Sequence, residues 1–140
     1  MAVILIVDDD ENIRDALYDL FESEHRCHLA ETAEQAIKWL ETEIYDVALT
    51  DISMPGLSGV ELLAVLRQHQ PSMPVIIISG LSDQEHAQGL IKMGAFEYLV
   101  KPFRLDVVEE TVQRALEERK QLLAIEAHAP SDETANLGVG

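Results

Sequence analysis

The stretch Val3-Ile-Leu-Ile-Val-Asp-Asp-Asp10 joins five apolar residues directly to three acids. Its apolar half lacks the polar alternation of a half-exposed strand, so it predicts a strand that is buried on both faces. Similar apolar runs occupy residues 47–49, 75–78 and 98–100, and a weaker run occupies residues 27–30. We therefore expect five short strands, of which the second along the chain is the least strongly marked.

Apolar residues at helical spacing separate these runs. The residues that share a helix face within each segment are Ile13, Ala16, Leu17 and Leu20; Ala33, Ala36, Ile37 and Leu40; Leu62, Leu63 and Leu66; and Ala87, Leu90 and Ile91. Strand and helix thus alternate five times with short connections, which is typical of a parallel sheet covered by helices on both faces. The sequence predicts the α/β class, with a doubly wound five-stranded sheet whose ligand site forms at the carboxyl ends of the strands.

A last helix is expected to begin near residues 104–106 and to end near Ala127. Its apolar side is formed by Val108, Val112, Ala115, Leu122 and Leu123. Small and polar residues dominate positions 130–140, so we expect a disordered tail there. The predicted organisation is one folded domain over residues 1–121, followed by a helix extension and a linker or tail over residues 122–140.

The composition excludes several classes of function. Among 140 residues, 26 are Asp or Glu and 10 are Lys or Arg. An acidic surface repels phosphate, so we expect this segment to bind neither nucleic acid directly nor an anionic membrane. No apolar run approaches the ~20 residues needed to cross a bilayer. Cys27 is the single cysteine, which excludes an intrachain disulfide and fits a soluble protein of the cytoplasm.

The acids after the first predicted strand have two interpretations. Acids at the start of a helix cap free amides and meet the positive end of the helix dipole, which accounts for Asp10 or Glu11. Capping does not readily account for Asp8 and Asp9, which end a buried strand. Neighbouring like charges are costly in such a place unless a cation offsets them.

Asp51 ends the third apolar run in the chain, at the start of Asp51-Ile-Ser-Met-Pro-Gly56. Because the ends of the first and third strands are adjacent in the expected sheet, Asp51 should face Asp8 and Asp9 across a small cleft. Three converging carboxylates suit Mg2+, which prefers oxygen ligands, whereas zinc would favour His or Cys. The five histidines are scattered and supply no such cluster.

A hydroxyl group and an ammonium group follow the two remaining strands. Ser79 closes the run at residues 75–78, and Lys101 follows the run at residues 98–100. Phosphoryl transfer requires fixed positive partners for the equatorial oxygens of the transferred group, and a carboxylate can be its covalent acceptor. The joint placement of these groups predicts phosphoryl transfer to Asp51.

These motifs resemble the receiver domains of response regulators in bacterial two-component systems. The matching stretches are Val7-Asp-Asp-Asp10, Asp51-Ile-Ser-Met-Pro-Gly56, Ile78-Ser-Gly80 and Lys101-Pro-Phe103, in family order, and the resemblance covers residues 3–121. It implies a flavodoxin-like fold with strand order 2-1-3-4-5. It also implies a phosphorylation-dependent signalling switch that catalyses only its own phosphorylation and dephosphorylation, rather than an enzyme with an external substrate.

The resemblance also implies a role for each site residue. Asp51 is the phosphoacceptor. The implied Mg2+ ligands are Asp8 acting through water, Asp9, Asp51 and the backbone carbonyl of Ser53. Lys101 would contact the phosphoryl group or pair with Asp51, while Ser79 would move to hydrogen-bond the new group and Tyr98 would swing inward behind it. The peptide bond before Pro102 is expected to be cis.

Phosphorylation would then change the surface formed by the fourth helix, fifth strand and fifth helix, roughly residues 83–121. The implied partners are a sensor histidine kinase as donor and, as output, a domain after residue 121 or a separate effector protein. A homodimer through the same surface is a further expectation. The sequence identifies neither the kinase nor the output.

Three alternatives remain open from the sequence. A haloacid-dehalogenase-like phosphatase would need a second Asp two residues after the nucleophile, where this chain has Ser53. A flavodoxin-like flavin binder would need a phosphate loop after the first strand, but residues 8–11 are acidic and would repel the flavin phosphate. A pseudo-receiver, which binds partners without accepting phosphate, is opposed by the complete set of site residues.

Overall fold

The computed structural model describes residues 1–52, 54, 56–80 and 84–128. Within them the strands are β1 (Val3–Val7), β2 (Arg26–Ala30), β3 (Val47–Asp51), β4 (Val75–Ser79) and β5 (Glu97–Val100). The helices are α1 (Glu11–Phe21), α2 (Ala33–Thr42), α3 (Gly59–His69), α4 (Gln84–Lys92) and α5 (Leu105–His128). The predicted alternation of strand and helix is confirmed. The tail that we expected to be disordered lies outside the described residues.

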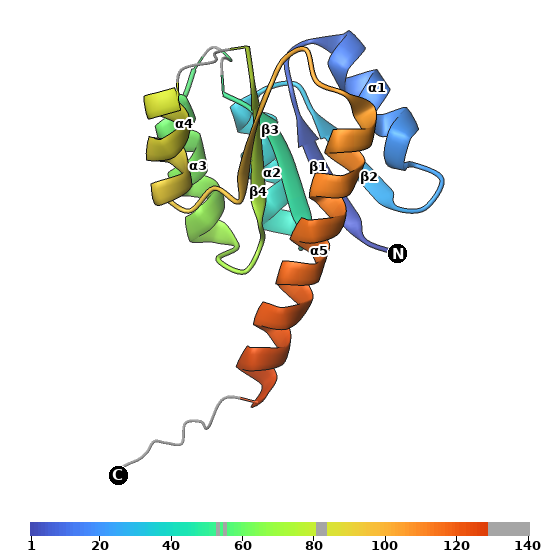
Figure 1. Cartoon of the computed structure of the whole chain (residues 1–140), viewed down its shortest axis with the longest axis vertical. Coiled ribbons are helices and arrows are strands. Elements are labelled where there is room, and N and C mark those ends of the chain that lie inside the picture. The colour runs from blue at the N-terminus through green and yellow to red at the C-terminus, as the bar shows by residue number, and fades with distance from the viewer. Residues whose placement is uncertain (53, 55, 81–83, 129–140) are drawn as a thin grey trace.

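The strands form one parallel sheet in the order β2-β1-β3-β4-β5. Both the fold class and the strand order expected from the sequence are therefore confirmed. Because these strands are parallel, the carboxyl ends of β1, β3, β4 and β5 lie at one end of the sheet, the carboxyl edge, which is at the top of Figure 1. This is the edge at which parallel α/β sheets bind ligands.

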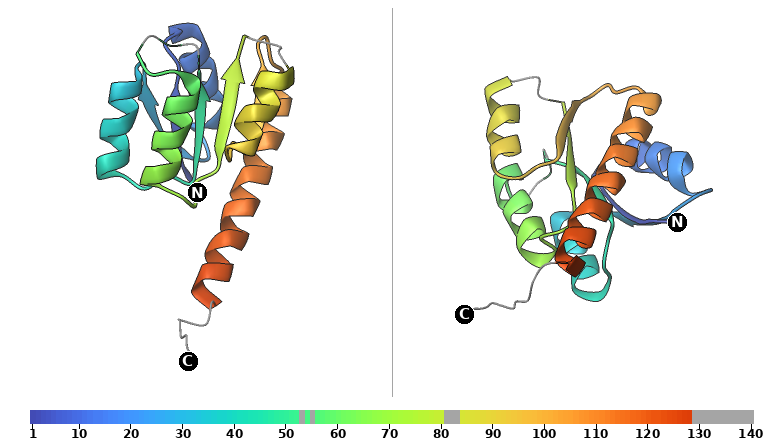
Figure 2. Two further views of the ribbon diagram at one scale, coloured as in Figure 1. Left: turned by 90° about the vertical axis from the view of Figure 1, so that its left-hand side faces the viewer. Right: turned by 60° about the horizontal axis from the view of Figure 1, so that its bottom comes forward.

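Two hydrophobic layers hold the helices to the two faces of the sheet. α2, α3 and α4 cover one face and α1 and α5 the other, as the turned views in Figure 2 show. Alternate residues of a strand point to opposite faces, so Leu5 and Val7 pack with the first group and Ile4 and Ile6 with the second. The runs of β1, β3 and β4 thus belong to strands buried on both faces, as expected.

The loop between β3 and α3 is shaped by its own sequence. Gly56 has φ +101°, a left-handed conformation that glycine adopts without steric cost. Ser58 then caps α3: its hydroxyl accepts from the Glu61 amide at 3.1 Å, and the Glu61 carboxylate accepts from the Ser58 amide at 2.9 Å. This capping box ends the loop that leaves Asp51 and fixes where α3 begins.

Four details of the expected burial are wrong. β5 is only partly buried, in keeping with its place at the edge of the predicted strand order, and Val100 is 40% exposed. Ile91 of α4 is exposed, whereas Leu90 beside it is buried. Leu122 and Leu123 are also exposed, because α5 continues past the lower edge of the sheet (Figure 1) and has no strand to cover there.

α5 is continuous across the predicted boundary between residues 121 and 122. Its length agrees with the predicted helix that ends near Ala127. The division into a domain of residues 1–121 and an extension of residues 122–140 stays a prediction. Within the described residues, none of the helices combines the length and apolarity that spanning a membrane requires.

Candidate functional site

Asp8, Asp9 and Asp51 converge at the carboxyl edge of the sheet. Parallel pairing aligns Val7 of β1 with Thr50 of β3, so the next residue of each strand emerges at the same edge. One carboxylate oxygen from each of the three acids lies within 4.8 Å of the others. Asp8 and Asp51 are only 1% and 3% exposed, while Asp9 is exposed to solvent. The three acids that the sequence expected to face one another therefore do lie close together.

The turn after β1 separates the helix cap from the acid cluster. The carboxylate of Asp10 accepts from the Asn12 amide at 2.9 Å and caps α1, which confirms the capping interpretation of this residue. The Asp10 amide in turn donates to Oδ1 of Asp8 at 2.8 Å. One residue thus starts the helix and also orients the first acid of the cluster.

Lys101 supplies the positive charge of the site. It directly follows β5, and the peptide bond between Lys101 and Pro102 is cis, the conformation that the resemblance implies. Its ammonium nitrogen lies 3.0 Å from Oδ2 of Asp8 and 3.5 Å from Oδ2 of Asp51. Its amide donates to the Ser79 carbonyl at 2.7 Å, so the lysine is held beside the end of β4.

The pKa values of the site reflect crowded and partly dehydrated charges. Burial raises the pKa of Asp8, and the amide of Asp10 and the contact with Lys101 only partly oppose it. Burial alone would lower the pKa of Lys101, but its contact with Asp8 and the charge of Asp51 outweigh burial and raise the pKa. The ammonium group therefore stays protonated, whereas the cost of burying the ionised form of Asp8 is only partly compensated.

The donor set suits a hard divalent cation. When ionised, the three carboxylates of the cluster carry three negative charges and Lys101 one positive charge, so a charge of minus two remains to be balanced. Among the described residues, the buried Oδ2 of Asp8 has no hydrogen-bond partner other than Lys101. An oxygen-only site of this kind matches the preference of Mg2+ and lacks the nitrogen and sulfur ligands that zinc favours.

The other predicted site residues differ in how far they can be placed. Ser79 is fully buried at the end of β4, the strand next to Asp51. Tyr98 of β5 is half-buried, and its ring meets the edge of the His86 ring of α4 at a centroid distance of 6.0 Å. Ser53, whose carbonyl was expected to bind Mg2+, lies outside the described residues.

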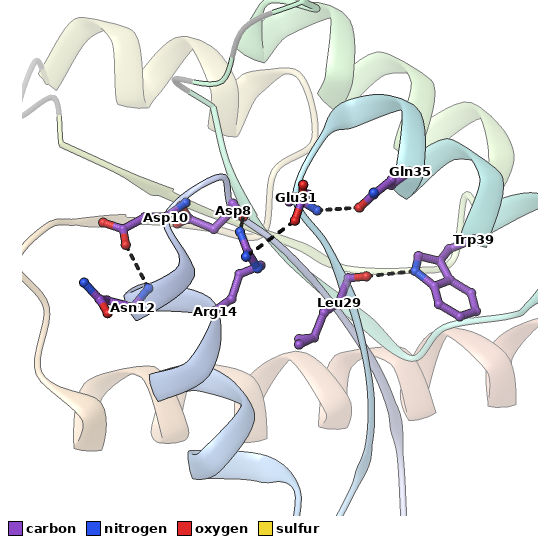
Figure 3. A network of polar contacts seen from close by, with 8 residues as sticks. All are labelled: Asp8, Asp10, Asn12, Arg14, Leu29, Glu31, Gln35 and Trp39. Atoms are coloured by element: carbon purple, nitrogen blue, oxygen red, sulfur yellow. Dashed lines mark hydrogen bonds and ion pairs between the residues drawn. The ribbon is translucent and has the colours of Figure 1, made fainter.

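Arg14 is a site neighbour that the sequence analysis missed. Its guanidinium donates to the backbone carbonyl of Asp8 at 2.7 Å and lies 3.6 Å from the carboxylate of Glu31 (Figure 3). A carbonyl group leaves no mark in a sequence, so no motif or spacing could have indicated this contact. The residue ties α1 to the ends of both β1 and β2.

The family model, the related sequences and the related structures all point to the same family. The family model described as the response regulator receiver domain matches residues 4–113. The DNA-binding transcriptional regulator NtrC of Salmonella typhimurium is 36% identical over 134 residues, which cover 93% of this chain but 29% of that protein. The crystal structure of NtrX from Brucella abortus is 32% identical with a TM-score of 0.84, and the match covers 89% of this chain and 29% of that one.

A complete domain of similar size is also among the relatives. The structure of TrrA from Thermotoga maritima, in complex with Mg2+-BeF, is 35% identical with a TM-score of 0.73. The match covers 83% of this chain and 100% of that one, whereas this chain spans less than a third of NtrC and NtrX. The resemblance inferred from the motifs is confirmed: the chain belongs to the response regulator receiver domain family.

Proposed function

We propose that this receiver domain is a signalling switch in which Asp51 accepts a phosphoryl group in a Mg2+-dependent reaction. The observation that carries the proposal is the convergence of three carboxylates at the carboxyl edge of the sheet, with the ammonium group of Lys101 in contact with two of them, Asp8 and Asp51. The family is one of regulatory domains. Self-catalysed phosphorylation and dephosphorylation is part of the proposal.

In the transfer step, a carboxylate oxygen of Asp51 attacks the phosphorus atom of the donor. The bond from phosphorus to the leaving group breaks, and the leaving group departs with the electron pair. Lys101 holds one equatorial oxygen of the phosphoryl group and Ser79 donates its hydroxyl to another. Bound Mg2+ would neutralise the developing charge on these oxygens, with Asp9, Asp51 and Asp8 through water as the side chains that hold it.

The switch follows from the new group at Asp51. A phosphoryl group adds charge and bulk where the apo site holds a carboxylate, so Ser79 moves toward it and Tyr98 follows into the vacated space. Tyr98 belongs to β5 and its ring contacts that of His86 in α4, so its motion would change the surface of α4, β5 and α5. An output domain beyond residue 121 or a separate effector would read this surface, and a homodimer through it is a further proposal.

The relatives support this assignment of partners. NtrC is described as a DNA-binding transcriptional regulator and is more than three times as long as the matched part, so an output domain is proposed here by analogy. A sensor histidine kinase is the proposed donor, and its phosphohistidine would supply the phosphoryl group. The cytoplasmic location and the lack of direct nucleic acid binding by this segment stay predictions.

The test is the intact mass of the chain after incubation with Mg2+ and acetyl phosphate. We expect a single phosphoryl adduct in the native chain that disappears when EDTA replaces Mg2+ and in Asp51→Asn. Thr50→Val is the matched control, because Thr50 is the buried neighbour on the same strand and its hydroxyl contacts the Asp51 carbonyl. This variant should keep the adduct.

Two results would count against the proposal. An adduct that persists in Asp51→Asn would place the phosphoryl group elsewhere. A folded native chain that takes no adduct from acetyl phosphate or from a phosphorylated cognate kinase would identify a pseudo-receiver. The haloacid-dehalogenase alternative predicts steady release of inorganic phosphate from small phosphate esters, and we expect none.

A further inference from the structure

Arg14 lies behind the acid cluster rather than in it. It stands in the first part of α1, and its side chain is only 13% exposed although it carries a full charge. One guanidinium nitrogen donates to the carbonyl of Asp8 at 2.7 Å, and another lies 3.6 Å from the exposed carboxylate of Glu31. Figure 3 shows the side chain reaching from α1 across the end of β1 toward β2.

The contact with the Asp8 carbonyl controls more than Asp8. The carbonyl of Asp8 and the amide of Asp9 belong to one planar peptide unit, so fixing the carbonyl also fixes the direction in which the chain enters Asp9. Asp8 is held at three further points: its amide donates to the Ala30 carbonyl at 3.1 Å, and its carboxylate accepts from the Asp10 amide at 2.8 Å and contacts the Lys101 ammonium group at 3.0 Å. Of these contacts, only that with Arg14 is made to the Asp8 carbonyl.

This attachment matters because the acids repel one another. Without a cation, Asp8, Asp9 and Asp51 lower their mutual repulsion by moving apart, and the turn after β1 is the part of the site that could rotate. Asp51 emerges from a strand paired on both sides and cannot follow. The geometry of the cluster therefore depends on how firmly the Asp8–Asp9 peptide is held.

We propose that Arg14 is a positioning residue that orients the Asp8–Asp9 peptide so that its two carboxylates and Asp51 form a preorganised Mg2+ site. The inference rests on the proposed function, since it concerns the same metal site. Groups that orient metal ligands without touching the metal typically change the affinity about 10–100-fold when they are removed. Arg14 has this relation to the cluster.

A purely electrostatic role for Arg14 predicts the opposite result. A guanidinium near the acids repels a divalent cation, so removing its charge should strengthen Mg2+ binding if charge were all that it contributed. Positioning predicts that the same change weakens binding. The sign of the change in Kd therefore separates the two roles.

The experiment is calorimetric titration of the full chain with MgCl2, with the fold of each variant checked by circular dichroism. We expect Arg14→Gln to raise the Kd for Mg2+ about tenfold. Arg14→Lys keeps the charge and hydrogen-bond donors but loses the planar fork, so its Kd should lie between those of the native chain and Arg14→Gln. It also serves as the second variant if Arg14→Gln does not fold.

Two matched controls isolate the contact. Arg114→Gln removes the same charge from α5, where Arg114 pairs with Glu110 and Glu97, and should leave the Kd within about twofold of the native chain. Glu31→Gln removes the exposed partner of Arg14 and keeps its contact with the Asp8 carbonyl. It should also stay within about twofold, because exposed ion pairs contribute little.

Three outcomes would overturn the inference. A Kd in Arg14→Gln that equals or falls below the native value would show that Arg14 does not position the Mg2+ site and acts only through its charge. An equal loss of affinity in Glu31→Gln would assign the effect to the link with β2 instead of the Asp8 carbonyl. A native chain that binds no Mg2+ would overturn the proposed function, and the inference with it, whereas normal native binding with an unchanged Arg14→Gln would overturn the inference alone.

Discussion

The two ends of the sheet hold acids in opposite electrostatic situations. At the carboxyl edge, Asp8, Asp9 and Asp51 lie together, and the ammonium group of Lys101 contacts Asp8 and Asp51. At the opposite end of the sheet, the amino edge, both carboxylate oxygens of Asp46 have hydrogen-bond partners. One accepts from the Val3 amide at 2.8 Å and the other from Arg119 at 2.9 Å.

Arg119 makes the amino edge a structural joint. Its side chain is 12% exposed and also donates to the Ser72 carbonyl at 3.1 Å, and the Ser72 hydroxyl donates to Glu126 of α5 at 3.0 Å. The carboxyl edge has excess negative charge that a cation or a reaction can use, whereas the amino edge has its charges compensated. The difference leads us to expect that an acid stabilises this fold only where its partners are complete.

The largest expected effect is a contrast between substitutions of one acid at each end of the sheet. In EDTA, Asp46→Ala should lower the free energy of unfolding by about 2 kcal/mol, because it leaves the largely buried Arg119 and the Val3 amide without their partner. Asp51→Asn should leave stability unchanged or raise it, because it relieves repulsion. Urea unfolding followed by the fluorescence of Trp39, the only tryptophan, measures both. Equal losses in the two variants would show that the acids at both edges are structural.

Mg2+ should reduce the difference in stability between the two variants, because it stabilises Asp46→Ala but not Asp51→Asn. At a concentration ten times the Kd, binding to the folded state alone raises the free energy of unfolding by about 1.4 kcal/mol. The native chain and Asp46→Ala should both gain this amount, since the metal site is at the other edge. Asp9→Asn and Asp51→Asn should gain little, and the readout is the urea midpoint with MgCl2 or EDTA. A gain in Asp51→Asn equal to the native gain would place Mg2+ elsewhere.

The smallest expected effect is a pH dependence that is specific to the carboxyl edge. Because burial raises the pKa of Asp8, the folded chain binds this proton more tightly than the unfolded chain does. Its contribution to stability is therefore complete below pH 3.8 and declines as pH rises through the raised folded-state pKa. The raised pKa of Lys101 adds stability that is fully present below pH 10.5, so it stays constant over this range.

In EDTA, the native chain should thus lose stability relative to Asp8→Asn as pH rises from about 4 to about 7. Thermal unfolding at fixed ionic strength across this range measures the difference. A native chain that instead gains stability over Asp8→Asn with rising pH would show that Lys101 compensates Asp8 fully, and the carboxyl edge would then resemble the amino edge.

The misplaced details of burial have a common cause. The run at residues 98–100 has the apolar pattern of a fully buried strand, but β5 forms the border of the sheet, as the predicted strand order requires, and Val100 is exposed. Leu122 and Leu123 continue the apolar side of α5 beyond the last strand it covers. A hydrophobic pattern records which face a residue prefers, but the extent of the neighbouring layer decides whether that face is covered.

The sequence by itself determined the alternation of strands and helices, and with it the edge at which Asp8, Asp51, Ser79 and Lys101 would meet. It could do so because periodicity is local and because the carboxyl ends of parallel strands always share one edge. Only the tertiary structure decided the contact of Arg14 with the Asp8 carbonyl and that of Arg119 with Asp46, 73 residues away. These contacts depend on how helices cross the ends of the sheet, and no local pattern of side chains encodes that geometry.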